Sequence, residues 1–329
     1  MVAPSSDPEK LVTPEAAQAS ARLGQANEHS GLPGSQGATM GAQQGPELAA
    51  VELQQESTAL SAPANVNRSA WWGKYTVPAQ KQSKWQLGPL SIWLQHLAHE
   101  WRLATKSRPD AYEKTVRHEG PTAIEALSAE TVPSRYCFSH MCDTVRLVPA
   151  LPDRPVVTKP DTPLYVYPNE QVTLYLSFPL WLRMEVGEPS RLLREMPLYR
   201  MSDTWFGPNT REGEICYASH TAGSVNLADL VRRSYRAATA VVVRNRSNSP
   251  LYVERLKINL PNLSLYADSD NMLWTNALVL EHTAGEGLAN LQIEHRAPSE
   301  AKNPQFIIGP RQVERRSALV RAFSSMLAS

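Results

Sequence analysis

The segment from Ser202 to His220 holds the densest set of chemically useful side chains in the sequence. An aromatic ring, a guanidinium, carboxylates, a thiol and an imidazole lie within nineteen residues, among Gly and Pro residues that favour turns. Trp205 would stack on a ring and Arg211 would pair bidentately with an anion, so a sugar, a nucleobase or an acidic small molecule would fit. The ligand-binding candidates are Trp205, Arg211, Glu212 and His220. The alternative is a long connection that Trp205 anchors in the core.

The carboxylates of this segment suggest a second kind of chemistry, the hydrolysis of a glycan. Glycoside hydrolases use two acids, one on each side of the scissile bond. Glu212 and Glu214 would share a face of an extended chain at about 7 Å, and with Asp203 they are the candidate catalytic residues. The other interpretation is a solvated strand face, because any Glu-x-Glu on a strand meets the same distance.

Thiols and imidazoles raise the alternative of a structural zinc site. Cys137, His140 and Cys142 lie within six residues, and Cys216 and His220 form a second pair. Zinc usually takes four such ligands, two of them close in sequence. The other interpretation is buried structural cysteines with surface histidines.

The sequence contains no complete motif for catalysis or nucleotide binding, and GxGxxG, GxxxxGK[ST], GxSxG and HExxH are all absent. The leading interpretation is therefore a non-enzymatic module that binds an unidentified protein or small molecule around Ser202–His220. No cofactor and no particular oligomeric state is predicted. A glycan hydrolase and a zinc-stabilised protein are the alternatives.

The elements that must position these residues are mainly β-strands. Short runs rich in aliphatic and aromatic residues alternate with Pro, Gly, Asn and Asp breaks. We expect one large or two abutting antiparallel β-sandwich units. The clearest predicted hairpin pairs residues 239–244 with residues 251–258 across a turn rich in Asn and Ser. An amphipathic helix is predicted over residues 311–328, where apolar residues recur near helical spacing after Pro310.

The composition divides the chain into three parts. Residues 1–68 contain no Phe, Trp or Tyr, and they predict a disordered low-complexity tail. A β-rich domain is expected over residues 69–300, with a division into two sub-sandwiches near 150–160. Residues 301–329 are expected to form a linker and the C-terminal helix.

Charge and hydropathy limit the partners and the cellular location that the sequence predicts. The 33 basic and 32 acidic residues give a net charge of +1, which disfavours nucleic acid as a partner. No apolar run approaches the ~18 residues of a membrane span. Three cysteines are too few for a disulfide framework, so we expect a soluble, cytoplasmic protein.

Several segments of the body carry a family resemblance, namely Leu164–Pro168, Phe178–Arg183, Ser202–Glu214 and Leu263–Asp268 with the following Leu273-Trp274. Over about residues 70–295 the chain resembles the family called domain of unknown function 432. The resemblance implies a soluble β-rich domain with an unassigned role, and it supplies no catalytic residue.

Overall fold

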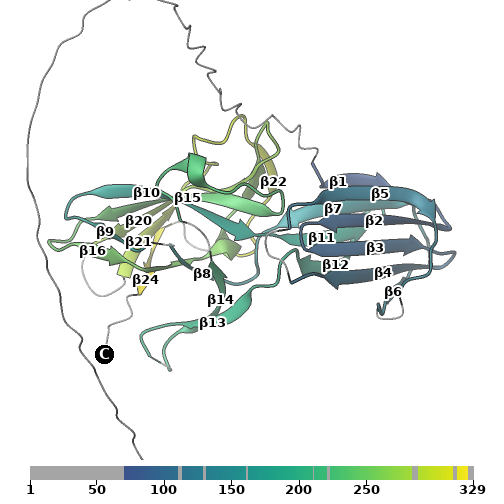
Figure 1. Cartoon of the computed structure of the whole chain (residues 1–329), viewed down its shortest axis with the longest axis horizontal. Coiled ribbons are helices and arrows are strands. Elements are labelled where there is room, and N and C mark those ends of the chain that lie inside the picture. The colour runs from purple at the N-terminus through teal and green to yellow at the C-terminus, as the bar shows by residue number, and fades with distance from the viewer. Residues whose placement is uncertain are drawn as a thin grey trace, which may run out of the picture. The chain divides into compact units, whose positions relative to one another are not determined.

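The computed structural model describes residues 70–109, 113–128, 131–160, 162–209, 211–220, 223–283, 288–313 and 317–324. The predicted tail, residues 1–68, lies outside these residues. Within them almost all regular structure is strand, and the helical elements are two single 3-10 turns, Leu227–Asp229 and Leu260–Asn262 (Figure 1). The prediction of a mainly β protein is therefore confirmed. Nowhere in the described ranges does a helix have the length and apolar character needed to cross a membrane.

The first sheet is antiparallel, with five strands in the order β5-β2-β3-β4-β6. Its strands are β2 (Lys81–Leu87), β3 (Leu90–His96), β4 (Glu100–Ser107), β5 (Val116–Ala123) and β6 (Ser134–Cys137). Side chains alternate between the two faces of a strand. Trp85, Ile92 and Leu103 are therefore fully buried on one face, whereas Lys84 and Arg117 lie on the other.

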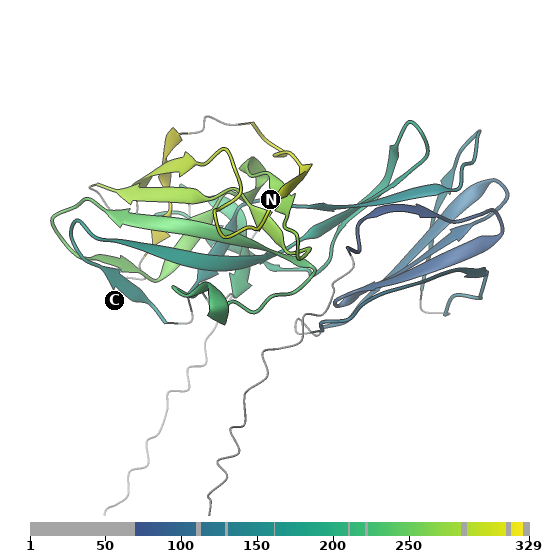
Figure 2. The same ribbon diagram turned by 90° about the horizontal axis from the view of Figure 1, so that it is seen from above.

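The second sheet has four antiparallel strands in the order β1-β7-β11-β12. Its strands are β1 (Gly73–Thr76), β7 (Thr144–Ala150), β11 (Trp181–Val186) and β12 (Arg191–Pro197). It forms a separate layer beside the first sheet (Figure 2). Leu147, Leu182 and Met184 join Trp85 and Ile92 in one buried cluster, and each such side chain stabilises the fold by about 1.5–3 kcal/mol.

The third sheet has eight strands and is mixed, because β15 (Arg236–Asn245) pairs with β10 antiparallel but with β19 and β20 in parallel. The predicted antiparallel arrangement is therefore wrong for these two pairs of strands. Parallel partners need a connection that crosses over, and the chain between β15 and β20 provides it. The other strands are β10 (Gln171–Pro179), β18 (Leu265–Ala267), β19 (Leu273–Thr275), β20 (Leu278–His282), β21 (Leu288–Ile293), β22 (Gln305–Ile308) and β23 (Ser317–Arg321).

A fourth sheet, in the order β13-β14-β8-β17-β24, positions the segment singled out in the sequence. Its strands are β8 (Val156–Lys159), β13 (Ser202–Phe206), β14 (Glu214–His220), β17 (Arg255–Ile258) and β24 (Phe323–Ser324). β14 pairs with β8 in parallel. A two-stranded sheet of β9 (Leu164–Val166) and β16 (Leu251–Val253) completes the fold.

The hairpin predicted between residues 239–244 and 251–258 does not form. β16 pairs with β9, and β17 pairs with β8 and β24, while β15 lies in another sheet. Asn245 accounts for the difference, because its side-chain amide donates to the carbonyl oxygens of Val166 at 2.8 Å and Ser249 at 2.7 Å. These bonds direct the turn toward β9, so the chain after it pairs there.

The C-terminal amphipathic helix predicted within residues 311–328 is also wrong for the described residues. β23 pairs with β21, and β24 pairs with β17. Val320 and Phe323 contact the main core, where Ala322 and Phe323 are buried. Val and Phe fit a pleated surface well, and two strand edges offer backbone partners, so tertiary pairing overrides the helical spacing.

The chain passes between the sheets more than once. β8 to β10 belong to later sheets, but β11 and β12 return to the four-stranded sheet. At the return point the Leu180 amide donates to the Tyr235 carbonyl at 3.0 Å, and the Leu198 amide donates to the Leu180 carbonyl at 2.9 Å. The predicted boundaries at 68, 150–160 and 300 stay predictions.

Candidate functional site

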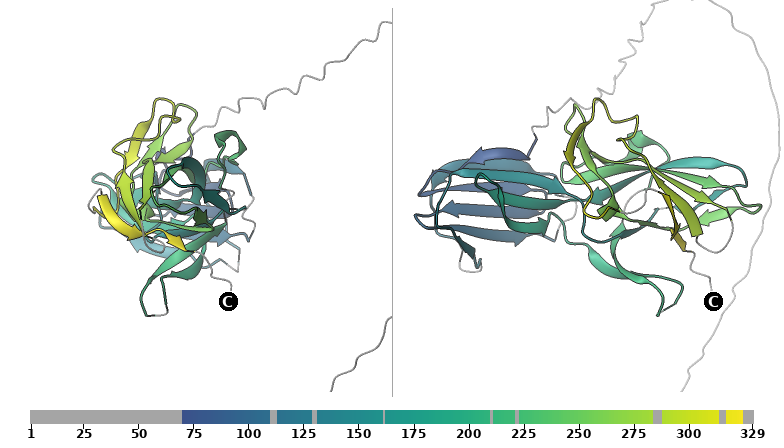
Figure 3. Two further views of the ribbon diagram at one scale, coloured as in Figure 1. Left: turned by 90° about the vertical axis from the view of Figure 1, so that its left-hand side faces the viewer. Right: turned by 180° about the vertical axis from the view of Figure 1, so that it is seen from behind.

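The segment Ser202–His220 forms a hairpin of β13 and β14 that projects from the sheets (Figure 3). Asp203 lies opposite Tyr217, and Trp205 lies opposite Ile215. Directly opposed residues share a face of a sheet, so these four side chains line one side of the hairpin. Trp205 is 41% and Ile215 is 55% exposed, so this side is open to solvent toward the tip.

The other side of the hairpin is closed by packing. Phe206 and Cys216 are buried against Val157, and Glu214 forms an ion pair with Lys257. Burial raises the pKa of the Cys216 thiol to about 11. This thiol is therefore protonated at neutral pH and is not activated as a nucleophile.

The loop between the two strands is held by its own residues. The Trp205 indole donates to the Asn209 carbonyl at 2.9 Å, and the Asn209 side-chain oxygen accepts from the backbone amides of Arg211 and Glu212 at 2.8 Å each. A Cβ atom on Gly213 would lie 2.8 Å from the Trp205 ring, so the ring packs directly on this glycine. Trp205 therefore anchors the loop, and its predicted role in ligand stacking stays a prediction.

The three candidate acids have separate surroundings. Asp203 pairs with Arg154 at 3.3 Å on the open side of the hairpin. Glu212 accepts a long hydrogen bond of 3.5 Å from the Asn209 amide in the loop, whereas Glu214 faces Lys257 on the closed side. The structure does not bring them together as a pair, and the hydrolase assignment stays a prediction.

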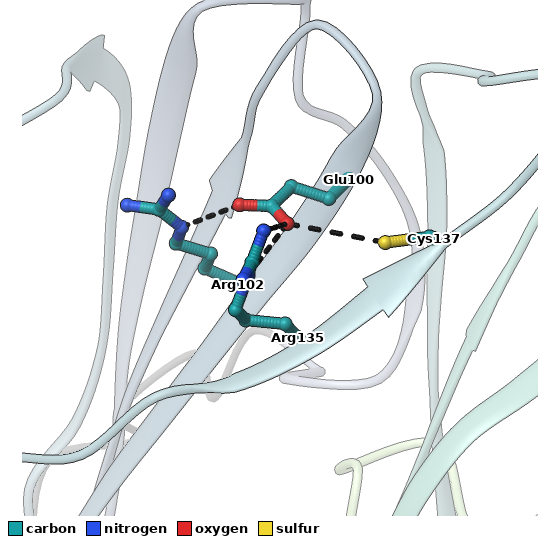
Figure 4. Close-up of polar contacts among 4 residues, drawn as sticks. All are labelled: Glu100, Arg102, Arg135 and Cys137. Atoms are coloured by element: carbon teal, nitrogen blue, oxygen red, sulfur yellow. Dashed lines mark hydrogen bonds and ion pairs between the residues drawn. The ribbon is translucent and has the colours of Figure 1, made fainter.

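Cys137 lies beside a charged cluster at the edge of the first sheet (Figure 4). Its sulfur is 3.9 Å from a carboxylate oxygen of Glu100. The same carboxylate accepts from the Arg102 guanidinium at 2.7 Å and from Arg135 at 2.6 and 2.7 Å. The hydrogen bonds from Arg135 and then Arg102 lower the pKa of Glu100, so two arginines hold this carboxylate as an anion.

The remaining zinc candidates do not gather around one point. Cys142 contacts the Thr144 carbonyl at 3.9 Å, Cys216 is buried in the hairpin, and His140 is exposed. His220 ends β14, and its side chain lies outside the described part. Across the described ranges no three His, Cys, Asp or Glu side chains are grouped to hold a metal. The zinc assignment stays a prediction.

A pocket of about 310 Å³ opens at the base of the hairpin, and we call it the aromatic pocket. Its lining comes from the segment before β8, from β11 and β12, from the β12–β13 link and from the hairpin. The lining residues are Arg154, Trp181, Pro197, Tyr199, Arg200, Met201, Asp203 and Tyr217. Its size falls at the lower end of the range of small-molecule sites.

Tyr217 is the best-defined polar group of the aromatic pocket. Its hydroxyl donates to Asp153 at 2.8 Å. The Arg154 guanidinium lies 5.5 Å from the Tyr217 ring centroid, and the Trp181 ring lies 6.4 Å away. Burial and the bond to Asp153 raise the pKa of Tyr217 to about 12, so the phenol is neutral at physiological pH.

Trp181 is held in place from outside the pocket. The Arg311 guanidinium lies 5.7 Å from its ring centroid. Arg311 is itself fixed, because it donates to the Leu151 carbonyl at 2.7 Å and pairs with Glu195. The indole is therefore preorganised, which reduces the entropy lost when a ligand stacks on it.

Arg236, the first residue of β15, is a buried cation. Arg236 is 9% exposed and donates to the hydroxyl of Ser177 at 2.9 Å and to its carbonyl. Burial, followed by the charge of Arg233, lowers the pKa of Arg236 to about 10, while Tyr235 and Tyr199 act in the other direction.

Sequence reasoning identifies Asp203 and misses the other main residues of this pocket, which are Arg154, Trp181, Tyr199, Arg200 and Tyr217. The residues that sequence reasoning missed lie on four separate segments of the chain, and no regular spacing in the sequence connects them. Two signals were present in the sequence: Tyr217 lies within the segment Ser202–His220, and Trp181 lies within Phe178–Arg183, which carries the family resemblance.

A family model described as "Protein of unknown function (DUF432)" matches residues 71–327. The resemblance noted in the sequence is thereby confirmed, and the match extends beyond residue 295 into the C-terminal strands. Neither a curated protein nor a solved structure matches the chain.

Proposed function

Because the chain belongs to the DUF432 family, whose description assigns no activity, we propose a function from the aromatic pocket itself. The body of the chain is a non-enzymatic β-sandwich module that binds a small ligand carrying both a ring and a negative charge. One observation carries this proposal: three aromatic side chains and two guanidinium groups line a single pocket of about 310 Å³.

The aromatic side chains support a ligand with a flat or puckered ring. Trp181, Tyr199 and Tyr217 present large apolar faces at little cost in side-chain entropy. The rings of Trp181 and Tyr217 are tilted by 41° to one another. They therefore form two walls of a corner rather than a flat stack, and a ligand ring can lie against them.

The arginines support a negative charge on the ligand. Arg154 and Arg200 line the pocket, and the only carboxylate of the lining, Asp203, already pairs with Arg154.

The ionisable groups support binding rather than acid–base chemistry. A general acid or base works best with a pKa near the operating pH. Tyr217 has its pKa raised to about 12, and the pKa of the neighbouring Cys216 is raised to about 11. Both keep their protons at neutral pH, and neither is a proton carrier there.

The free cysteines support the predicted cytoplasmic location. Cys137, Cys142 and Cys216 are all unpaired thiols, one of them exposed. Exposed thiols persist in reducing compartments, whereas oxidising ones favour disulfides.

Isothermal titration with matched ligand pairs tests the function. Nucleoside monophosphates and sugar acids are compared with the corresponding nucleosides and neutral sugars. We expect one charged class to bind and its neutral counterpart to bind at least about tenfold more weakly. Trp181→Ala and Arg154→Gln should each weaken binding by a similar factor, because they remove a stacking wall and a charge-assisted contact.

Trp205→Ala and Arg211→Ala serve as matched controls on the same hairpin, outside the pocket. They should leave the dissociation constant unchanged. If they weaken binding while Trp181→Ala does not, the site is the hairpin loop predicted from the sequence. If no charged ring compound binds the native protein, the proposed function is wrong.

A further inference from the structure

A second pocket lies on the solvent-facing side of the first sheet, at the end of the β2–β3 hairpin. We call it the basic pocket. It holds about 190 Å³ and is lined by Lys84, Gln86, Arg108, Thr115, Arg117 and Glu119. Three cations and one carboxylate line it, and no aromatic side chain does. Its chemistry therefore differs from that of the aromatic pocket.

The backbone builds this pocket around the turn between β2 and β3. The Gly88 amide donates to the Thr115 carbonyl at 2.8 Å, and the Arg108 amide donates to the Pro89 carbonyl at 2.8 Å. Arg108 and Thr115 come from the two ends of the β4–β5 connection. The turn thus holds both residues at the mouth of the pocket.

The floor of the basic pocket comes from two paired strands. Gln86 lies opposite Arg117, and Lys84 lies opposite Glu119, on the outward face of β2 and β5. The Gln86 side chain is fixed because its oxygen accepts from the Ser91 hydroxyl. Lys84 and Arg117 therefore project from paired strands, whereas Arg108 comes from the β4–β5 connection.

The nearby carboxylates pair closely with only one of these three cations. The Lys84 ammonium lies 3.9 Å from Glu119, and the Arg108 guanidinium lies 3.6 Å from Glu113, whereas Arg117 contacts Glu119 at 3.0 Å. A good charge-assisted hydrogen bond is about 2.7–2.9 Å long. Three cations thus share two carboxylates, and two of the pairs are loose.

We propose that the basic pocket binds a tetrahedral oxyanion, the phosphate or sulfate group of a small molecule, through Lys84, Arg108 and Arg117. Arginine offers a planar fork and lysine a compact point charge, and together they suit a group with several equivalent oxygens. Glu119 is the anion that competes for Lys84 and Arg117. It must give up these contacts when the ligand enters.

Replacing Glu119 by Gln is the sharpest test, because it removes the carboxylate that competes with the oxyanion and should strengthen anion binding. A substitution that merely damaged the basic pocket would weaken anion binding. Sodium phosphate and, separately, sodium sulfate are titrated at constant ionic strength set with sodium chloride. We expect saturable binding at one site, about tenfold tighter for Glu119→Gln. The double variant Lys84→Gln, Arg117→Gln should lose saturable binding. Glu188→Gln removes the same charge from an exposed pair with Lys74 elsewhere, and it should change nothing.

Binding by either anion supports the proposal, and the stronger one identifies the group. The proposal is overturned if neither anion shows saturable binding to the native protein and neither shows it to Glu119→Gln. It is also overturned if the double variant binds with the native dissociation constant. Unchanged circular dichroism and unfolding midpoints would show that the variants are folded. Trp181→Ala should bind the anion with the same dissociation constant as the native protein. That result would separate the basic pocket from the aromatic pocket.

Discussion

At the scale of single residues, Glu100 is a carboxylate of the first sheet that two arginines hold. Its side chain is 8% exposed and contacts Arg102 and Arg135 (Figure 4). The pKa of Glu100 is lowered below its ordinary value of 4.5 in the folded protein. A lowered folded pKa means that the native state binds this proton less readily than the unfolded state does. The carboxylate thus stabilises the fold at neutral pH.

The lowered pKa of Glu100 predicts how the stability of the fold depends on pH. The contribution of Glu100 should be fully present above pH 4.5 and should be lost as the pH falls through the lower folded value. In urea unfolding between pH 7 and pH 3, Glu100→Gln should lower the midpoint at pH 7 and reduce the further loss at acid pH. Glu188→Gln, which breaks an exposed pair, should have little effect at pH 7. Equal midpoints for the native protein and Glu100→Gln at pH 7 would contradict this account.

At the scale of elements, the β2–β3 turn depends on one glycine. Gly88 has φ +57°, and a Cβ atom there would lie 2.4 Å from the ring of Tyr235. Tyr235 is 1% exposed, so its ring has no room to move aside. The turn therefore needs glycine both for its backbone angle and for the close approach of the ring.

Gly88→Ala should lower the free energy of unfolding by at least about 2 kcal/mol, since a left-handed backbone and an overpacked core each cost about 1–2 kcal/mol. Urea denaturation measures the change. Gly309→Ala is the matched control, because its nearest contact would be a comfortable 3.8 Å from Phe306. A loss of equal size in both variants would show that space at Gly88 is not the cause.

Individual strands of this fold can be predicted from the sequence, but their pairing cannot. Alternation is local, so the strands Trp181–Val186 and Gln171–Pro179 are recognisable from their own residues. Pairing is not local, and the side chain of Asn245 redirects the chain in a way that no periodicity reveals. The aromatic pocket is harder still to predict, because Trp181 and Tyr217, whose rings lie 6.4 Å apart, belong to two different sheets.

At the scale of the whole molecule, Trp71 ties the beginning of the β-rich body to a distant part of the chain. Trp71 is 3% exposed, belongs to the main core and donates from its indole to the Ser234 carbonyl at 2.7 Å. The Tyr75 hydroxyl donates back to the Trp71 carbonyl at 2.8 Å. Trp71, which precedes the first strand, is therefore part of the core.

Two truncations test this role of Trp71. A chain without residues 1–69 should keep the unfolding midpoint of the full chain. A chain without residues 1–72 should lose about 3–5 kcal/mol of stability, the usual cost of deleting a buried Trp side chain. Differential scanning calorimetry compares the three chains. Should the shorter truncation already be destabilised, residues before Trp71 contribute to the fold.

The hydroxyl of Tyr217 also restricts what a ligand can bring to the aromatic pocket. Its single hydrogen is directed at Asp153, and with a pKa of about 12 the group keeps that hydrogen throughout the physiological range. Only its lone pairs remain for a ligand. An alcohol or an amine on the bound ring can donate to them, whereas a carboxylate or phosphate oxygen meets only repulsion there. A ligand of the proposed kind is therefore expected to bind with its hydroxyls toward Tyr217 and its anion toward Arg154 and Arg200.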